Sequence, residues 1–466
     1  MNKTNFDTLQ LNPALLKNLD SLGYHDMTAI QAESLPHILK GQDVIGKAKT
    51  GSGKTAAFGL GLLQKLNPQK YRVQALVLCP TRELADQVAR EIRKLARGIE
   101  NVKVLTLCGG TPFGPQKGSL EHGAHIIVGT PGRVEDHLYK GNLDLYHLNC
   151  FVLDEADRML DSGFEETLDD IIEYLPTQRQ TLLFSATYPD TIQAMSQRIM
   201  QQPCTIEVND THSESSIAQT FYKIESTGGD DFEQRITALR LLLLEHHPES
   251  TLVFCNTKKD TQLVSDTLND YGFKTMALHG DLDQKDRDRT LVLFANKSTS
   301  ILVATDVAAR GLDVDKLDAV FNFQLARELD VHTHRVGRTG RAGNKGIACT
   351  LFNSKEQYRI NKLEEHQNQT TTLAPLPSRK LLDQAAFRPP MVTLLIDGGK
   401  KQKVRPGDIL GALTGENGIA GSEVGKIVIF DFAAYVAISR QAANNALKKL
   451  EKGKLKGKMF QVRRIS

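Results

Sequence analysis

Residues 48–55 constrain the fold of this chain more than any other segment. They read AKTGSGKT, with a strand-like apolar stretch before them and a helix-like run after them. Gly51 and Gly53 let the backbone curl so that successive N–H groups face a polyphosphate. Lys54 adds a positive charge at the outer phosphates, and Thr55 offers a hydroxyl to Mg²⁺. The segment predicts a nucleotide-binding loop, made up of Ala48, Lys49, Thr50, Gly51, Ser52, Gly53, Lys54 and Thr55.

A second candidate nucleotide-binding element, the acidic segment FVLDEAD, follows at residues 151–157. Its three apolar residues indicate a buried strand, and its carboxylates stand at the carboxyl end, where open parallel sheets bind ligands. Asp154 is suited to holding Mg²⁺ through water, and Glu155 to orienting or deprotonating an attacking water. A solvated helix start is the alternative, but the phosphate loop upstream favours a nucleotide-hydrolysing site.

The composition is that of a globular protein of about three domains, with 466 residues, 40% hydrophobic and 24% charged. The N-terminus lacks the apolar core of a signal peptide, and no apolar run has the length of a membrane span. The six cysteines stand singly, without a CxxC pair. We therefore expect buried thiols in a reducing compartment, the cytoplasm.

Strand-like and helix-like runs alternate in two separate blocks of the chain. This pattern predicts two parallel-sheet α/β domains, at residues 1–208 and 217–366. The first block has apolar runs at 75–79, 102–107, 125–128, 150–153 and 181–184. The second has runs at 251–255, 275–278, 300–304 and 319–323. Polar residues 209–216 and the proline-containing residues 367–390 are predicted to be linkers.

The last block, residues 391–466, has a different order. Strands are predicted at 391–396, 425–431, 434–439 and 459–465, and helices at 406–413 and 441–451. This βαββαβ order is that of ferredoxin-like RNA-recognition modules. The block holds 14 Lys and Arg against 6 Asp and Glu, so its formal net charge is +8, while that of the rest of the chain is −5. Such asymmetry suggests a polyanionic partner, although a solvated surface explains it equally well.

From Phe6 to about Thr350 the chain resembles the DEAD-box RNA helicases, whose name residues 154–157 spell. The resemblance implies two tandem RecA-like domains that bind ATP and Mg²⁺. Residues 4–31 resemble the family's adenine-reading segment, in which the Gln31 amide contacts adenine and Phe6 or Tyr24 stacks on it. Met27 stands where the family usually has proline, which changes local stiffness but removes no hydrogen-bonding group.

Other segments resemble the family's RNA and coupling motifs. Residues 80–85, 109–110 and 130–133 look like the RNA contacts of the first domain, and residues 279–281 and 305–313 like those of the second. Residues 185–187 look like the segment that links ATP state to RNA grip. The resemblance assigns RNA contacts to Arg82, Gly110, Thr130, Arg133, Arg287 and Thr305, and a ribose contact to Asp313.

The run HRVGRTGR at 334–341 resembles the family's arginine-finger motif. Arg338 and Arg341 would reach the γ-phosphate held by the first domain and join Lys54, Asp154 and Glu155 as catalytic residues. The resemblance implies that ATP closes the cleft between the domains, that the closed state disrupts a short duplex locally without processive movement, and that hydrolysis releases the RNA.

The C-terminal block departs from the usual RNA-recognition module. Its first strand lacks the expected aromatic, and Tyr435 alone falls on an aromatic position of the third. Binding is therefore predicted on loops and basic edges, with Lys400, Lys401, Lys403, Arg405, Lys448 and Lys452 as the candidate residues. A DEAD-box core with such a module resembles the bacterial DbpA group. That resemblance implies an RNA-dependent ATPase that acts as a monomer on a large-subunit ribosomal RNA hairpin in pre-ribosomal particles during ribosome assembly.

Three alternatives stay open at this point. The chain could be an ATP-dependent RNA clamp that scaffolds other proteins, although Glu155, Arg338 and Arg341 are all present. It could be a DNA translocase of related fold, which RNA or DNA stimulation of the ATPase distinguishes. The C-terminal block could instead bind a protein, its charge serving only to solvate it.

Overall fold

The computed structural model describes residues 5–48, 51–208, 217–225, 231–309, 317–340, 346–367 and 370–465. Lys49, Thr50, Asp313, Arg341 and the whole of the predicted linker 209–216 lie outside these residues. The chain forms two compact units, one before about residue 211 and one after it.

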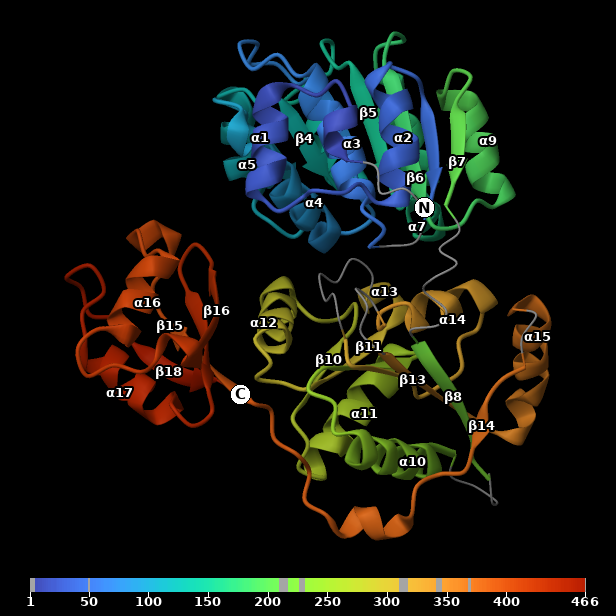
Figure 1. The fold of residues 1–466 in the computed structure, drawn as a ribbon, viewed down its shortest axis with the longest axis vertical. Helices are drawn as coiled ribbons and strands as arrows, with labels where there is room; N and C mark the ends of the chain where they lie inside the picture. Colours follow the sequence, from blue (N-terminus) through green and yellow to red (C-terminus); the bar gives the residue numbers. More distant parts are fainter. Residues whose placement is uncertain are drawn as a thin grey trace. The chain divides into compact units, whose positions relative to one another are not determined.

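The first unit is built on one seven-stranded, all-parallel sheet (Figure 1). Across the sheet lie β3 (Val104–Leu107), β4 (Ile126–Gly129), β2 (Ala75–Leu78), β5 (Cys150–Asp154), β6 (Gln180–Ser185), β1 (Val44–Lys47) and β7 (Cys204–Glu207). The central strands are apolar and buried throughout, because helices cover both faces of a parallel sheet. The helices are α1 (Pro13–Ser21), α2 (Ala29–Leu39), α3 (Lys54–Lys65), α4 (Arg82–Leu95), α5 (Phe113–Glu121), α6 (Pro131–Tyr139), α7 (Ala156–Asp161), α8 (Glu165–Glu173) and α9 (Asp190–Ile199).

The second unit begins with a second seven-stranded parallel sheet. Its strands lie in the order β10 (Thr275–Leu278), β11 (Ile301–Thr305), β9 (Thr251–Cys255), β12 (Ala319–Asn322), β13 (Gly346–Phe352), β8 (Ile217–Lys223) and β14 (Leu373–Ala374). Its helices are α10 (Asp231–His246), α11 (Lys258–Asp270), α12 (Gln284–Ala295), α13 (Asp306–Ala309), α14 (Leu329–Val336) and α15 (Gln357–Gln367).

Part of the segment 367–390, which the sequence predicts to be a linker, packs on this second sheet. Strand β14 pairs with β8. Beyond it, the Phe387 ring lies edge to face against Phe273, with 5.6 Å between the ring centroids. These contacts fasten the segment to the core of the second sheet.

The C-terminal block of the second unit is a four-stranded antiparallel sheet. Its strands lie in the order β16 (Val424–Ile429), β17 (Ala434–Ser439), β15 (Met391–Ile396) and β18 (Val462–Ile465), with helices α16 (Pro406–Thr414) and α17 (Ala443–Lys452). The first and third strands of the block are central, and the βαββαβ order is confirmed. The predicted fold class, two parallel-sheet domains followed by this α+β module, is thereby confirmed.

Only one face of the antiparallel sheet packs on its own helices. Along β15, Val392, Leu394 and Ile396 enter the module's core, whereas Thr393 and Leu395 point to the opposite face. On that face, the buried Thr393 hydroxyl accepts a hydrogen bond from Asn296 at 3.1 Å and shares another with Ser298 at 2.7 Å.

Apolar contacts extend this interface between the module and the preceding domain. Leu395, Ile465 and Tyr435 pack with Leu293 of α12 and with Met276 of β10. The sheet face that RNA-recognition modules commonly leave open is therefore covered by the second parallel-sheet domain over these residues.

Candidate active site and nucleic-acid interface

The carboxyl ends of the first sheet gather the motifs of the first unit at one edge. Because β5, β6 and β1 are neighbours, the loops that follow them, at 154–157, 185–187 and 48–55, are neighbours too. The loops after β3, β4 and β2 hold residues 109–110, 130–133 and 80–85. The topology thus puts the predicted nucleotide motifs on one half of this edge and the predicted RNA motifs on the other half, the RNA half, as expected for ligands of open parallel sheets.

The described part of the phosphate loop has the backbone that anion binding requires. Gly51 and Gly53 have φ of +85° and +96°, a conformation that side chains rarely adopt. A Cβ at Gly53 would lie 2.5 Å from the Gln31 amide nitrogen, so this glycine is also required by close packing. The buried Lys54 ammonium donates to the Ala48 carbonyl at 2.8 Å, which holds it across the loop. The N-terminus of α3 begins at this lysine and favours negative charge.

Asp154 and Glu155 stand at the end of β5 in buried surroundings, 3% and 6% exposed. Burial raises the pKa of Asp154 to about 7, although the nearby Lys54 ammonium lowers it in part. Its Oδ1 atom is buried and has no hydrogen-bond partner among the described residues. Glu155 takes a left-handed conformation, with φ of +54°, and caps α7. An orphaned carboxylate oxygen of this kind fits a cation or its bound water.

The pKa of Asp154 gives a test of this site by pH. Its folded pKa lies above its unfolded value of about 3.9, so the folded state holds more protons between pH 4 and 7 and its stability falls as pH rises through that window. Asp154→Asn should therefore stabilise the nucleotide-free chain above pH 7, by about 2–4 kcal/mol, while having little effect near pH 4. Thermal denaturation of both chains at several pH values measures this. Equal pH dependence of the two chains would contradict it.

Asp157, which has no predicted role, bonds to Thr187, which belongs to the segment predicted to link ATP state to RNA grip. The Thr187 backbone N–H and hydroxyl both donate to Asp157 Oδ2, at 3.0 and 2.7 Å, and Ser185 Oγ accepts from the Asp157 N–H at 3.3 Å. Burial alone would raise the pKa of Asp157, but the hydrogen bonds from Thr187 and Ser185 bring it below its ordinary value. The acidic motif and residues 185–187 are thereby one hydrogen-bonded element.

The three candidates for adenine binding lie in different environments. Phe6 is only 3% exposed and packs in the core of the unit. The Tyr24 hydroxyl donates to Glu91 at 2.7 Å, and the Lys94 ammonium lies 4.8 Å from its ring centroid. The Gln31 amide donates to the Gly53 carbonyl and accepts from the Thr28 N–H, which leaves one donor and one acceptor capacity for a base.

On the RNA half of the edge, the structure brings residues 108–116 and 130–133 together. The Gly109 N–H donates to Thr130 Oγ1 at 3.4 Å, and Gly110 follows with φ of +71°. The Arg133 guanidinium donates to the Thr111 carbonyl at 2.9 Å and lies over the Phe113 ring. Arg82, at the start of α4, pairs with Asp86 at 3.8 Å. The arrangement puts exposed glycines and half-buried guanidinium groups along one edge, which suits a phosphate backbone.

In the second unit, the arginine-rich motif is organised around Arg335, which is 1% exposed. Its guanidinium makes a bidentate pair with Asp306, at 2.6 and 2.8 Å. It also donates to the Asn256 side chain and to the Gln324 carbonyl, each at 2.7 Å. Arg335 thus ties α14 to the ends of β9, β11 and β12, and Arg338 follows it in the turn after α14.

Removing this guanidinium should destabilise the second unit strongly. Arg335→Met leaves Asp306 and two polar groups without their shared partner, a loss of about 3–5 kcal/mol. A domain of this size should then melt about 6–20 °C lower. Lys259→Met, which removes an exposed cation of the same unit, is the control and should shift the melting temperature little. Similar melting curves for the two variants would show that the network is not structural.

Arg287 and Thr305 are the predicted RNA contacts of the second helicase domain. The Arg287 guanidinium donates to the Ala308 carbonyl at 2.9 Å, and Thr305 Oγ1 accepts from the Ala308 N–H at 3.4 Å. The two predicted contacts thus meet at α13. Asp313 and Arg341 lie outside the described residues.

The module carries its predicted basic residues on two neighbouring segments. Lys400, Lys401, Lys403 and Arg405 are exposed in and after a short helical turn, and Lys448 and Lys452 are exposed on α17. Lys456 donates to the Lys403 carbonyl at 3.0 Å and pairs with Asp408 at 3.3 Å, which joins the loops around 403 and 456. The predicted basic edge therefore continues from one loop to the next.

Two aromatic residues of the module have opposite exposures. Tyr435 is half-buried, and burial raises its pKa. Phe432, which the sequence analysis does not single out, is 65% exposed in the loop between β16 and β17. The Lys400 and Lys401 N–H groups donate to the carbonyls of residues 430 and 431 in that loop. An exposed aromatic in a turn beside lysines is the signal that could have identified it.

Comparison with protein families and curated proteins agrees with this arrangement. The family described as DEAD/DEAH box helicase matches residues 28–195, the helicase conserved C-terminal domain matches residues 234–343, and the DbpA RNA binding domain matches residues 393–464. The ATP-dependent RNA helicase DbpA of Escherichia coli K12 is 53% identical over 99% of both chains. The protein of the same name from Bacillus subtilis 168 is 36% identical over 99% of this chain and 100% of its own.

Solved structures of RNA-bound proteins also match the fold of this chain. Saccharomyces cerevisiae Dbp5 bound to RNA and ADP BeF3 matches with a TM-score of 0.73 and 28% identity, over 82% of this chain and all of that one. Mss116p bound to single-stranded RNA and AMP-PNP matches with a TM-score of 0.72 and 28% identity, over 83% of each chain. Within the described residues, each helix is too short or too polar to cross a bilayer.

Proposed function

Since this chain belongs to the DbpA family of DEAD-box ATP-dependent RNA helicases, we propose that it remodels large-subunit ribosomal RNA during ribosome assembly, directed to a ribosomal RNA hairpin by its C-terminal module. Its activity is that of an ATP-dependent RNA helicase, and the module binds RNA. The observation that carries the finer proposal is the exposed basic edge of the module, beside a sheet face that is covered.

We assign the chemistry of hydrolysis to residues of both domains. Lys54 and the loop backbone bind the phosphates, and Glu155 orients the attacking water and accepts its proton. Asp154 and Thr55 would hold Mg²⁺, which neutralises developing charge on the phosphates. Among the described residues no cluster of three or more acidic, His or Cys ligands exists, which fits an ion held by one carboxylate, water and substrate phosphates. Arg338 and Arg341 complete the site, and Asp313 contacts the ribose.

The helicase domains bind the sugar-phosphate backbone of RNA. The residues are Arg82, Gly110, Thr130 and Arg133 of the first domain and Arg287 and Thr305 of the second. Backbone contacts position the strand without reading its sequence, so selectivity has to come from elsewhere. We assign it to the module. The hydrogen-bonded pair Asp157 and Thr187 would connect the state of the nucleotide to the RNA contacts.

The covered face of the module decides how it recognises RNA. Tyr435 packs beside Leu293, so the one aromatic at a stacking position is not available as an open platform. The lysines around residues 400–405 and the exposed Phe432 remain accessible. A structured hairpin, bound through its phosphates and loop, fits this surface better than an extended strand.

A charge reversal tests this assignment. Lys400→Glu/Lys401→Glu should weaken hairpin binding at least about tenfold and lower the slope of log affinity against log salt by about 1.5–2, because two phosphate contacts are lost. Lys259→Glu/Lys274→Glu, at exposed lysines of the same unit, should keep hairpin affinity. Tyr435→Phe should change it less than about twofold. The assignment would be overturned if hairpin affinity is unchanged in Lys400→Glu/Lys401→Glu but falls in Tyr435→Phe.

The domain boundaries follow the same reasoning. We propose an N-terminal helicase domain at 1–208 that includes the adenine-reading segment 4–31, a C-terminal helicase domain at 217–366, a connecting segment at 367–390 that packs on this domain through β14 and Phe387, and the RNA-binding module at 391–466. We further propose that the chain acts as a monomer. We also propose that it acts in the cytoplasm, which its unpaired and mostly buried cysteines support.

A further inference from the structure

A pocket of about 530 Å³ in the second unit lies between α14 and α15, away from the motifs assigned above to RNA. Helix α15 lines it with Arg359, Lys362, Leu363 and His366, which share one face because they follow the i, i+3, i+4, i+7 spacing of a helix face. Residues 325–328 and the start of α14 line the other side. The volume is in the range of small-molecule sites.

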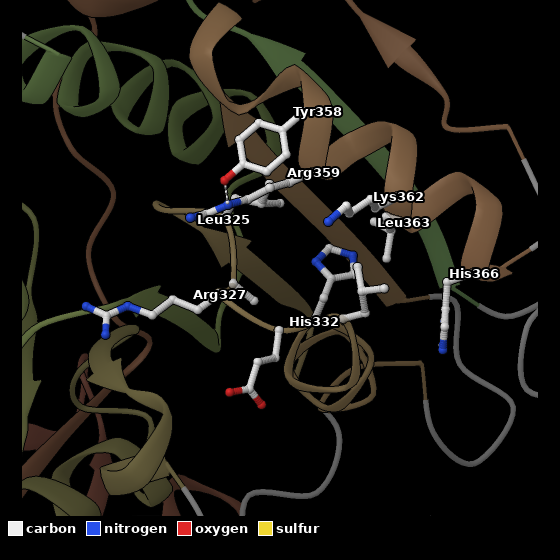
Figure 2. Close-up of a pocket in the computed structure, with 11 residues that line it drawn as sticks. Leu325, Arg327, His332, Tyr358, Arg359, Lys362, Leu363 and His366 are labelled. Atoms are coloured by element: carbon white, nitrogen blue, oxygen red, sulfur yellow. Dashed lines mark hydrogen bonds between the residues drawn. The ribbon is translucent and has the colours of Figure 1, made fainter.

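The floor of the pocket is apolar, and its rim is basic. Leu325, Leu329 and Leu363 belong to a small core cluster with Phe221. Arg327, Arg359 and Lys362 also line the pocket, and Figure 2 shows Lys362 above His332, whereas the Arg327 side chain points away from them. In the part of the chain that the structure describes, these three cations make no ion pair, and Glu328 is the one acidic side chain in the lining. The described side chains therefore leave a charge of about +2 at the pocket.

A buried imidazole adds an independent sign of a ligand. His332 is 2% exposed and projects from α14 toward α15, below Lys362 (Figure 2). Neither of its ring nitrogens has a hydrogen-bond partner among the described residues. Its ring is held by stacking on Phe221, with 5.8 Å between centroids. Burial first, and then the Arg335 charge, lower its pKa to about 4, so the ring is neutral and presents one N–H donor. Buried polar atoms without partners call for an explanation, and a bound group supplies one.

We propose that this pocket binds the phosphate group of a small phosphorylated molecule. Arg359 and Lys362 supply charge-assisted donors, and Arg327 adds positive charge at the rim. The His332 N–H adds a neutral donor at the base, and the start of α14 faces the anion with its positive end. A phosphate of charge between −1.5 and −2 matches the net charge of the lining. The site is built wholly from the second unit, whereas the nucleotide loop belongs to the first.

The position of the pocket gives its occupant a route to the catalytic arginines. Helix α14 begins at the pocket, carries Arg335 in its last turn and ends just before Arg338. A ligand that orders the start of this helix would act on the element that positions the proposed arginine finger. Binding itself is the claim to be tested first.

Nuclear magnetic resonance of the full chain with ¹³C-labelled histidine gives a readout of this site alone. Inorganic phosphate is the probe, and the His332 signal is identified by its loss in His332→Phe, which keeps a ring against Phe221. We expect a saturable shift of that signal in the unsubstituted chain. Arg359→Ala/Lys362→Ala, at residues that are not buried, should weaken the response at least about tenfold. Lys259→Ala/Lys274→Ala removes the same charge elsewhere and should leave it unchanged.

Three results would overturn the proposal. One is the absence of a saturable phosphate-induced shift at His332 in the unsubstituted chain. Another is a shift of the same signal by single-stranded RNA that phosphate cannot displace, which would make the pocket part of the RNA path. A response that is equally weakened by both double substitutions would indicate general charge attraction and would also count against a built site.

Discussion

Replacing Arg338 by alanine should lower the RNA-stimulated kcat for ATP hydrolysis by about 10³-fold or more. An arginine supplied to the γ-phosphate is worth 10³–10⁵ in the rate of related nucleotide hydrolases, because it stabilises charge that develops only in the transition state. Arg338 stands in the turn after α14, which the buried Arg335 network fixes to three strand ends. Nucleotide affinity should change little, since the phosphate loop lies in the other unit.

Steady-state ATPase and equilibrium binding of a fluorescent ADP, measured on the same preparation, separate these two effects. Arg379→Ala removes an exposed arginine of the same unit and should hydrolyse ATP like the parent chain. If Arg338→Ala also retains parental turnover, the assignment of Arg338 to the transition state is wrong.

Glu155→Gln should bind ATP normally and lose turnover by about 10²–10⁴-fold, the range associated with general acid–base catalysis. The amide keeps the size of the carboxylate and accepts the left-handed backbone at this position equally well, but it cannot take the proton of the attacking water. Because the loss falls on the chemical step, kcat should fall while the concentration of ATP needed for half-maximal rate stays within a few-fold.

Glu166→Gln is the matched control, since it removes an exposed carboxylate at the start of α8. It should leave kcat unchanged. Single-turnover hydrolysis distinguishes slow chemistry from slow product release. Near-parental single-turnover rates in Glu155→Gln would show that another group activates the water.

The local motifs of the chain were predictable because each one combines a strand, a turn and a helix within a few residues. The phosphate loop, with its two left-handed glycines, and the acidic strand end at residues 150–154 are of this kind. The βαββαβ order of the module follows from the same local alternation of apolar residues. The final strand starts at Val462, three residues later than predicted.

Contacts between distant segments were not predictable. Tyr24 looks like a stacking residue in the sequence, but its hydroxyl bonds to Glu91, 67 residues away on α4. The role of Arg335 depends on Asn256, 79 residues away, and on the meeting of three strand ends. The docking of the module depends on Thr393 reaching Asn296 and Ser298, roughly a hundred residues earlier. Such pairs are set by tertiary packing, which periodicity and propensity do not encode.

The central claim is that the helicase core hydrolyses ATP on RNA that the module selects. ATP hydrolysis by the full chain should be measured against a titration of two RNAs of equal length, one carrying the large-subunit ribosomal hairpin and one with the hairpin sequence scrambled, and against DNA of the hairpin sequence. The account predicts half-maximal stimulation by the hairpin RNA at a concentration at least about tenfold lower, and no stimulation by the DNA. Equal stimulation by the two RNAs, or by RNA and DNA, would contradict it.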